Sequence, residues 1–431
     1  MVRNIFIVGL DDFHRKLLKT IRNSEQYRFH GLLDYDQVVL PAHYPIDDMI
    51  AAGKEQLDRF DGRVDAIIGH WDFPTTTLLP VFREHCGLDG PSLGGVLIAE
   101  HKYWSRLRER QVVPDCTPRF EAVDPFADDA AERIGLEFPF WLKPVIAFSS
   151  VLAFYVSSHA DLEFALARTR ERIGGFGEPF GKLLSMAHMP DDIPVEIDGY
   201  HCIAEQPIEG EQCTAEGYIQ NGVPHVYGIV DSFREPNLSS FSRYQLPSRL
   251  PQKVQRRIID YTKRVVPHLD IDNTPFNVEY FWDTTTDRLW LLELNTRISK
   301  SHSPMFVDVT GASNHEVAVE VALGIEPQYP RREGCCATAA KFMLRHFHDA
   351  LVTRVPTERE LQELENAFPG TSIEIAVKQG TRLSEMPGQE PYSYEVAVVF
   401  MGAPDTRTLL QEYEQLKARL PLEFDDSVAS A

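Results

Sequence analysis

The sequence predicts an α/β protein with a parallel sheet at its N-terminus, antiparallel strands in its middle and a small β-rich C-terminal lobe. Residues 1–100 alternate strand and helix patterns, Phe276–Asn295 reads as a hairpin, and 335–425 contains several strand patterns. A chain of 431 residues exceeds one hydrophobic core. We therefore expect three domains: an N-terminal α/β domain, a central domain with a lid subdomain, and the C-terminal lobe, with boundaries at 1–112, 113–330 (lid about 113–203) and 331–431.

The N-terminal part begins with the short apolar strand NIFIVG, which precedes a helical stretch near Phe13–Ile21. A second strand is expected at Phe29–Leu33, and the segment VDAIIGH predicts a third before a helix at Thr75–His85. Such alternation is typical of a parallel sheet covered by helices. The first strand ends in GLDD and lacks the GxGxxG pattern, so this domain is not expected to bind a dinucleotide.

Composition excludes several classes of function. The net charge of −21 argues against nucleic-acid and anionic-membrane partners. No apolar run approaches the roughly 20 residues needed to span a bilayer, and the N-terminus lacks the pattern of a signal peptide. Six scattered cysteines, without CxxC or Cys/His zinc spacing, favour a reduced cytoplasmic protein.

The hairpin Phe276–Asn295 carries the strongest chemical signal. Side chains two residues apart along a strand share a face. Glu279 therefore lies on one face of the first strand. On the second strand, Glu293, Asn295 and Arg297 are spaced two residues apart and share a face. If the turn is centred in DTTTDR, Glu279 faces Glu293, and two such carboxylates repel unless a cation separates them. Oxygen ligands of this kind suit Mg²⁺. The alternative is a solvated hairpin with an outer charged face.

The order E…ELNTR is similar to the metal-binding hairpin of the ATP-grasp superfamily, which includes biotin carboxylase, D-alanine–D-alanine ligase and the L-amino-acid ligases. The resemblance covers roughly residues 1–425 and implies an ATP-grasp fold with a pre-grasp N-terminal domain. It implies ATP and Mg²⁺ (or Mn²⁺) as cofactors. By resemblance Glu279, Glu293 and Asn295 hold the metal, and Arg297 steadies the reacting phosphoryl group as a catalytic residue.

Two lysines fit the same resemblance. Lys143 lies in the apolar strand FPFWLK and needs an anionic partner. The resemblance implies that this lysine binds the α- and β-phosphates of ATP. The alternative is an internal salt bridge. Lys102 matches the first ATP-contacting lysine, although a surface lysine is equally compatible with the pattern. The family's glycine-rich loop is replaced by VIAFSS, where Ser149 and Ser150 offer hydroxyl and N–H donors. Gly174–Gly177 either supplies mobility in place of that loop or forms a plain surface loop, and we favour the surface loop.

The segment HCIAEQPIEGEQCTAEG resembles the family's adenine hinge. Glu205 and Ile208 match the adenine positions. The ribose position falls on Gln212, with Glu211 beside it. Without the resemblance, these side chains read as solvated charges at strand edges.

The second substrate is expected to meet the C-terminal lobe. Lys341 and Arg345 are candidates for binding a carboxylate or phosphate, with a strand salt bridge as the alternative. Biotin carboxylases resemble this chain but carry a catalytic glutamate four residues after the motif arginine. Ser301 occupies that position here, and His302 offers partial compensation. This substitution favours a carboxylate–amine ligase over a carboxylase.

The resemblance thus implies an ADP-forming ligase that joins small-molecule carboxylate and amine substrates through an acyl phosphate. The physical requirement is to hold two anions in line while metal, lysines and arginine neutralise their charge. A biotin carboxylase-like enzyme and a catalytically silent ATP-binding protein are the alternatives. A homodimer is one candidate assembly.

Overall fold

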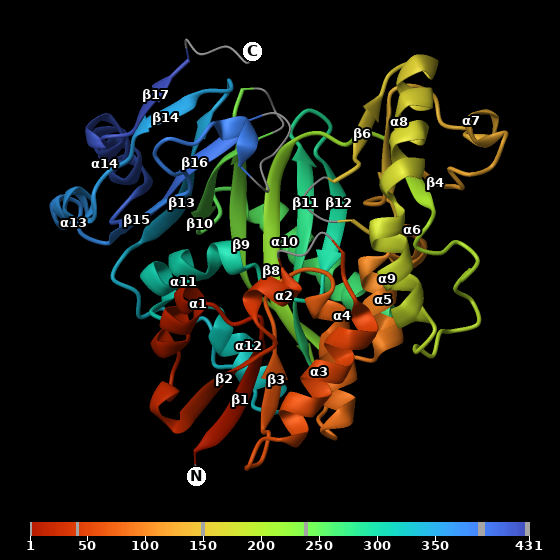
Figure 1. Cartoon of the computed structure of the whole chain (residues 1–431), viewed down its shortest axis with the longest axis horizontal. Helices are drawn as coiled ribbons and strands as arrows, with labels where there is room; N and C mark the ends of the chain where they lie inside the picture. The colour runs from red at the N-terminus through yellow and green to blue at the C-terminus, as the bar shows by residue number, and fades with distance from the viewer. Residues whose placement is uncertain (1, 40–42, 148–150, 237–239, 387–392, 427–431) are drawn as a thin grey trace. The chain divides into compact units, whose positions relative to one another are not determined.

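The computed structural model describes residues 2–39, 43–147, 151–236, 240–386 and 393–426 (Figure 1). Two compact units divide the chain. Unit 1 comprises Met1–Tyr227, Pro251–Lys300 and His315–Tyr329, and unit 2 comprises Gly228–Leu250, Ser301–Asn314 and Pro330–Ala431.

Unit 1 begins with the predicted parallel sheet, of strand order β2-β1-β3. Its strands and helices are β1 (Arg3–Val8), α1 (Asp12–Leu17), β2 (Tyr27–Leu32), α2 (Tyr35–Val38), α3 (Ile46–Asp58), β3 (Ala66–Ile68) and α4 (Thr75–His85), with 3-10 turns at Leu18–Thr20 and Ser24–Gln26. Ile5 and Ile7 of β1 are fully buried and share a core with Ala318 and Val319 of α12 (His315–Ala322). The apolar strands and the helix after β3 therefore form as predicted.

A second, antiparallel sheet in unit 1 has the order β4-β7-β5-β6. The elements of this part of the chain are α5 (Leu93–Glu100), α6 (Lys102–Val112), β4 (Phe120–Val123), α7 (Ala130–Arg133), β5 (Phe140–Pro144), β6 (Phe154–Val156), α8 (His159–Arg172), α9 (Gly174–Leu184) and β7 (Cys202–Glu205). Helix α8 packs on β6, which Figure 1 shows beside it. The prediction of a loop at Gly174–Gly177 is wrong, because these residues open α9. Burial of Phe180 and Leu183 on the same helix outweighs the low helix propensity of glycine.

The predicted hairpin is formed by β11 (Thr274–Asp283) and β12 (Arg288–Asn295), and β11 also pairs with β8 (Glu211–Gln220). Asp283 organises the turn, since its carboxylate accepts hydrogen bonds from the backbone N–H groups of Thr285 and Thr286. Helix α10 (Gln252–Val265) contributes its buried face to the same unit, followed by a 3-10 turn at Val266–Leu269. Thr262 of α10 is hydrogen-bonded to the buried Tyr280 hydroxyl at 2.9 Å, which ties the helix to the hairpin.

Unit 2 contains the β-rich C-terminal lobe that the sequence predicts. Strand β9 (Val223–Arg234) enters unit 2 at Gly228, and the order there is β9-β10-β13-β16-β15, with a separate pair β14-β17. The other elements are β10 (Phe241–Leu246), α11 (Ser303–Thr310), β13 (Thr338–His346), β14 (Leu351–Arg354), α13 (Glu358–Ala367), β15 (Thr371–Ile375), β16 (Tyr394–Ala403), α14 (Thr406–Arg419) and β17 (Glu423–Asp425), with 3-10 turns at Lys300–His302 and Leu383–Glu385. Phe342 of β13 stacks on Tyr413 of α14 at 3.7 Å between ring centroids, which fixes the helix on the sheet.

The helices are short. The longest described ones, α8, α10 and α14, have 14 residues each. None of the helices in the described ranges is both long and apolar enough to cross a membrane.

Candidate active site

Two rows of polar side chains cross strands β12, β11 and β8 on one face. In the first row Glu293 faces Glu279, which faces Thr214. The register confirms the predicted pairing of Glu279 with Glu293. Directly opposed side chains on antiparallel strands have Cβ atoms about 5 Å apart, so two like charges are held together here by backbone hydrogen bonds.

The second row places Asn295 opposite Asn277, which faces Glu216. The Asn295 amide nitrogen donates to the Asn277 carbonyl oxygen at 3.2 Å, and the Asn277 amide donates to the backbone carbonyl of Arg297 at 2.9 Å. This orientation leaves the side-chain oxygen of Asn295 as the atom that can face a cation beside Glu293.

Gln212 of β8 lies close to the paired glutamates. Its amide donates to Glu279 at 2.8 Å, and the side chain is 4% exposed. The ribose contact suggested for Gln212 stays a prediction, and in this structure the side chain orients a carboxylate. Glu211 is exposed at the start of β8, and Ile208 is half-buried in the link before it.

Arg297 is held by an aspartate from the N-terminal sheet. Its guanidinium is bonded to Asp72, which follows β3, with Nε 2.6 Å from the carboxylate, and donates to the backbone carbonyl of Ile298 at 3.1 Å. Burial opposes the charged form, but Asp72 together with Glu100 and Glu293 raises the pKa of Arg297. Arg297 therefore stays a fixed cation close to the paired glutamates.

Glu100, at the end of α5, is a second carboxyl beside this arginine. Burial, with a smaller contribution from the Asp72 charge, raises the pKa of Glu100 to about 7, although Arg297 and Lys102 oppose the rise. The Thr296 hydroxyl donates to it at 3.4 Å. A carboxyl with this pKa can take up or release a proton near neutral pH.

Lys102 stands at the first position of α6, immediately after Glu100 and His101. Its ammonium donates to the backbone carbonyl of Ala147 at 2.6 Å. Burial lowers the pKa of Lys102, and the charge of Lys143 lowers it further, while Glu293, Glu100 and Glu205 raise it. Lys102 is thus electrostatically coupled to the hairpin glutamates and to the second predicted lysine.

Lys143 lies in a buried ion-pair network. Its ammonium contacts Glu205 at 2.6 Å, and the other oxygen of Glu205 accepts from Arg106 at 2.6 Å. Arg106 also pairs with Glu109 at 2.5 Å, so two carboxylates flank one guanidinium. Burial opposes ionisation of Glu205, yet Arg106 and Lys143 lower the pKa of Glu205 to about 2. The salt-bridge alternative for Lys143 is therefore present in this structure, and its partner is the residue predicted on the adenine side.

The predicted substrate residues of unit 2 fall into two groups. Lys341 lies opposite Tyr244 in the sheet register, with its ammonium 3.4 Å from the Ser301 hydroxyl, and the His302 ring packs edge-on against Tyr244. Arg345 instead donates to the Phe241 carbonyl and to Ser393, and pairs with Glu395 at 3.5 Å. Thus Ser301, His302 and Lys341 lie together, whereas Arg345 takes part in a structural network.

The two serines predicted to contact ATP, Ser149 and Ser150, lie outside the described residues.

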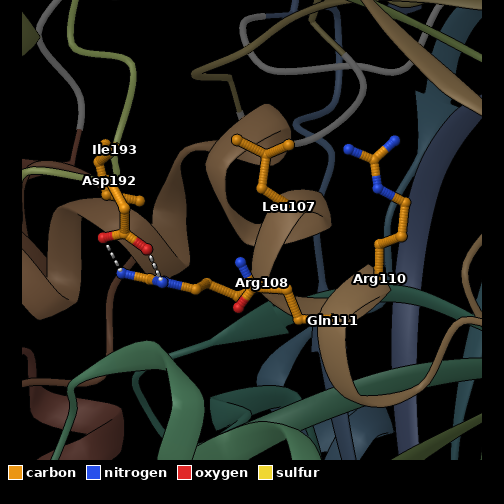
Figure 2. Close-up of a pocket in the computed structure, with 6 residues that line it drawn as sticks. All are labelled: Leu107, Arg108, Arg110, Gln111, Asp192 and Ile193. Atoms are coloured by element: carbon orange, nitrogen blue, oxygen red, sulfur yellow. Dashed lines mark hydrogen bonds and ion pairs between the residues drawn. The ribbon is translucent and has the colours of Figure 1, made fainter.

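A surface hollow of about 260 Å³ lies elsewhere in unit 1. Figure 2 shows it between α6 and the segment of Asp192, where Arg108 forms a two-point ion pair with Asp192. None of the predicted site residues lines this hollow. Its volume is below the range of about 300–1,000 Å³ that is usual for small-molecule sites. We therefore do not assign it as the ligand site.

Sequence reasoning missed four charged residues that complete the site: Asp72, Glu100, Arg106 and Glu109. Asp72 had one available signal, because it follows a parallel strand at the carboxyl edge where such sheets place ligand-binding groups. The other three lie in helical segments whose pattern reads as amphipathic surface.

Residues 136–304 match the family described as the ATP-grasp domain. A sequence comparison with curated proteins gave no significant match. L-amino acid ligase from Bacillus licheniformis has a similar structure, with 15% identity and a TM-score of 0.72 over 98% of this chain and 99% of that one. Carboxyaminoimidazole ribonucleotide synthase from Aspergillus clavatus, solved with ATP, has 15% identity and a TM-score of 0.66 over 97% and 98% of the two chains. Biotin carboxylase from Campylobacter jejuni has 15% identity and a TM-score of 0.63 over 99% and 93%. These likenesses confirm the predicted fold class.

Proposed function

We propose that the protein, whose residues 136–304 match the ATP-grasp domain family, is an ADP-forming carboxylate–amine ligase. It joins a small-molecule carboxylate to an amine, as an amide or peptide bond, through an acyl phosphate. The observation that carries the proposal is the register of Glu279 opposite Glu293 with Asn295 in the next row.

Glu279, Glu293 and Asn295 are the residues that would hold Mg²⁺. They fit the ion because two carboxylates and an amide oxygen form a hard-oxygen donor set, and because the opposed carboxylates repel without a cation. When bound with ATP, the metal neutralises phosphate charge and favours transfer of the terminal phosphoryl group. The Gln212 amide orients Glu279 within this set.

Cationic side chains of unit 1 supply the rest of the positive charge that the phosphates need. Arg297 is anchored by Asp72, which keeps the guanidinium in one place for a developing negative charge on the reacting phosphoryl group. Lys102 and Lys143 offer ammonium groups to the phosphates, with Glu205 and the Ala147 carbonyl as their partners in this structure. Positioning of two anions in line, rather than covalent catalysis, is the work assigned to these residues.

The amine acceptor must lose a proton when it attacks the acyl phosphate. Glu100 supports this step, because a carboxyl with a pKa of about 7 that lies beside Arg297 is suited to accept a proton near neutral pH. The similarity in fold to an L-amino acid ligase supports amino acids as the first substrates to test.

The proposal is tested by ADP release with pooled amino acids and amines, followed by isotope analysis of the active pair. With an ¹⁸O-labelled carboxylate, one label is expected in inorganic phosphate, because the carboxylate oxygen attacks the terminal phosphorus. Label confined to the ligated product, or release of AMP and pyrophosphate, would exclude the acyl-phosphate route.

Stabilisation by Mg-ATP provides a test that needs no substrate. Glu293→Gln is expected to abolish the Mg-dependent rise in melting temperature, while Glu84→Gln, at an exposed position of α4, retains it. An undiminished rise in Glu293→Gln would remove the metal role from the hairpin. Binding of Mg-ATP without turnover on any carboxylate and amine pair would indicate a nucleotide-binding protein instead.

A further inference from the structure

Three histidines from distant parts of the sequence meet in the interior of unit 1. His14 lies on α1, His70 directly follows β3 and Gly69, and His315 is the first residue of α12. Their exposed fractions are 4%, 1% and 0%. The rings of His14 and His70 stack at 4.0 Å between centroids, and that of His315 lies 5.1 Å from His70 and 5.5 Å from His14.

The ring nitrogens of this cluster are not satisfied by the protein. Nε2 of His14 and both ring nitrogens of His70 and His315 have no hydrogen-bond partner within the described part of the chain. A buried polar atom without a partner costs about 1–3 kcal/mol, so five such atoms in one cluster call for a ligand. One ring nitrogen from each histidine can be chosen so that all three lie within 4.8 Å of one another.

The remaining nitrogen of His14 is oriented by a carboxylate. Asp11 lies 2.7 Å from Nδ1 of His14 and also accepts the His14 backbone N–H at 2.7 Å, which caps α1. In the tautomer in which Nδ1 donates to Asp11, Nε2 carries the lone pair. A carboxylate behind a histidine is the arrangement that orients and strengthens imidazole ligands in metal sites.

We propose that His14, His70 and His315 form a binding site for a divalent transition-metal ion of the zinc class, separate from the hairpin carboxylates. An all-imidazole set excludes Mg²⁺ and Ca²⁺, which require oxygen ligands, and suits Zn²⁺. Tetrahedral Zn–N bonds of about 2.05 Å place ligand nitrogens roughly 3.3 Å apart, so the ring nitrogens, which lie within 4.8 Å of one another here, would have to turn toward a shared ion. Three histidine ligands would leave a fourth position of a tetrahedral ion for water or a small ligand.

The position of the site gives it a structural consequence. His14 follows β1 and His70 follows β3, so both lie at the carboxyl edge of the parallel sheet, and His315 joins α12 to it. Asp72, which anchors Arg297, lies two residues after His70. A bound ion would therefore fix the segment that positions the arginine.

The test uses the full-length protein, stripped with a chelator and dialysed against limiting Zn²⁺. One zinc ion per chain is expected, and Co²⁺ in its place should give the visible absorption bands of a tetrahedral nitrogen site. These two measurements on the unmodified chain do not depend on the folding of any variant. Absence of stoichiometric zinc, or a cobalt spectrum of an octahedral oxygen site, would overturn the proposal.

Variants then assign the ligands. His70→Gln and His315→Gln should each weaken zinc binding by at least about 100-fold, and Asp11→Asn by about 10- to 100-fold. Zinc content should be unchanged in His188→Gln, at an exposed histidine, and in Cys335→Ser/Cys336→Ser and Glu293→Gln, which remove potential zinc ligands elsewhere in the chain. Zinc that survives both histidine substitutions, or that disappears with the cysteines or Glu293, would refute the site.

Discussion

Replacing Glu100 by glutamine should make the stability of the protein less sensitive to pH. Burial raises the pKa of Glu100 from 4.5 to about 7. Between these values the unfolded chain has released the proton while the folded chain still holds it, so wild-type stability falls as pH rises through this range. Glutamine has no proton to lose, and the Glu100→Gln variant escapes this fall.

The interval from 4.5 to about 7, at about 1.36 kcal/mol for each pH unit, corresponds to about 3 kcal/mol. Glu100 retains some contact with solvent, which reduces the expected effect to about 2 kcal/mol. The variant should therefore gain about 2 kcal/mol relative to wild type between pH 4.5 and pH 8.

Urea unfolding at a series of pH values, with EDTA and without nucleotide, measures this difference. Glu84→Gln removes an exposed carboxylate of the same unit and serves as the control. A difference between Glu100→Gln and wild type that stays constant from pH 4.5 to pH 8 would show that Glu100 ionises like a solvated carboxyl. That result would also remove it as the proton acceptor of the proposed ligase.

Further outcomes follow from the ion-pair network and from the substrate side. Lys143→Ala should weaken ATP binding by at least about 10-fold in calorimetry, since it removes a cation from the phosphates; unchanged affinity would leave Lys143 as a structural partner of Glu205. Glu205→Gln should lower stability by about 3–5 kcal/mol, because Arg106 and Lys143 lose a buried counter-ion, whereas Glu211→Gln at an exposed position should be near neutral in denaturant titration. The pKa of Glu205 is lowered to about 2, so its contribution to stability is present above pH 4.5 and is lost as pH falls toward 2. Bicarbonate should not stimulate ADP release with free biotin, because Ser301 replaces the expected base; stimulation would restore the carboxylase alternative.

The sequence by itself determined the hairpin and its chemistry. Strand periodicity assigned Glu279 and Glu293 to facing positions, and the turn residues set the register, because both depend on neighbours close along the chain. The same local rules predicted the parallel N-terminal sheet and the strands of the C-terminal lobe. They failed at Gly174–Gly177, where burial of Phe180 on α9 outweighed glycine propensity.

Only the tertiary structure decided which charges and histidines meet. Arg297 and its anchor Asp72 are 225 residues apart, and Arg106 and Glu205 are 99 apart. His14 and His315 are far apart in the sequence and still share one buried cluster. Periodicity reports which face of an element a side chain occupies. The partner across that face depends on how separate elements pack, because interactions between distant segments form only when the fold brings those segments together.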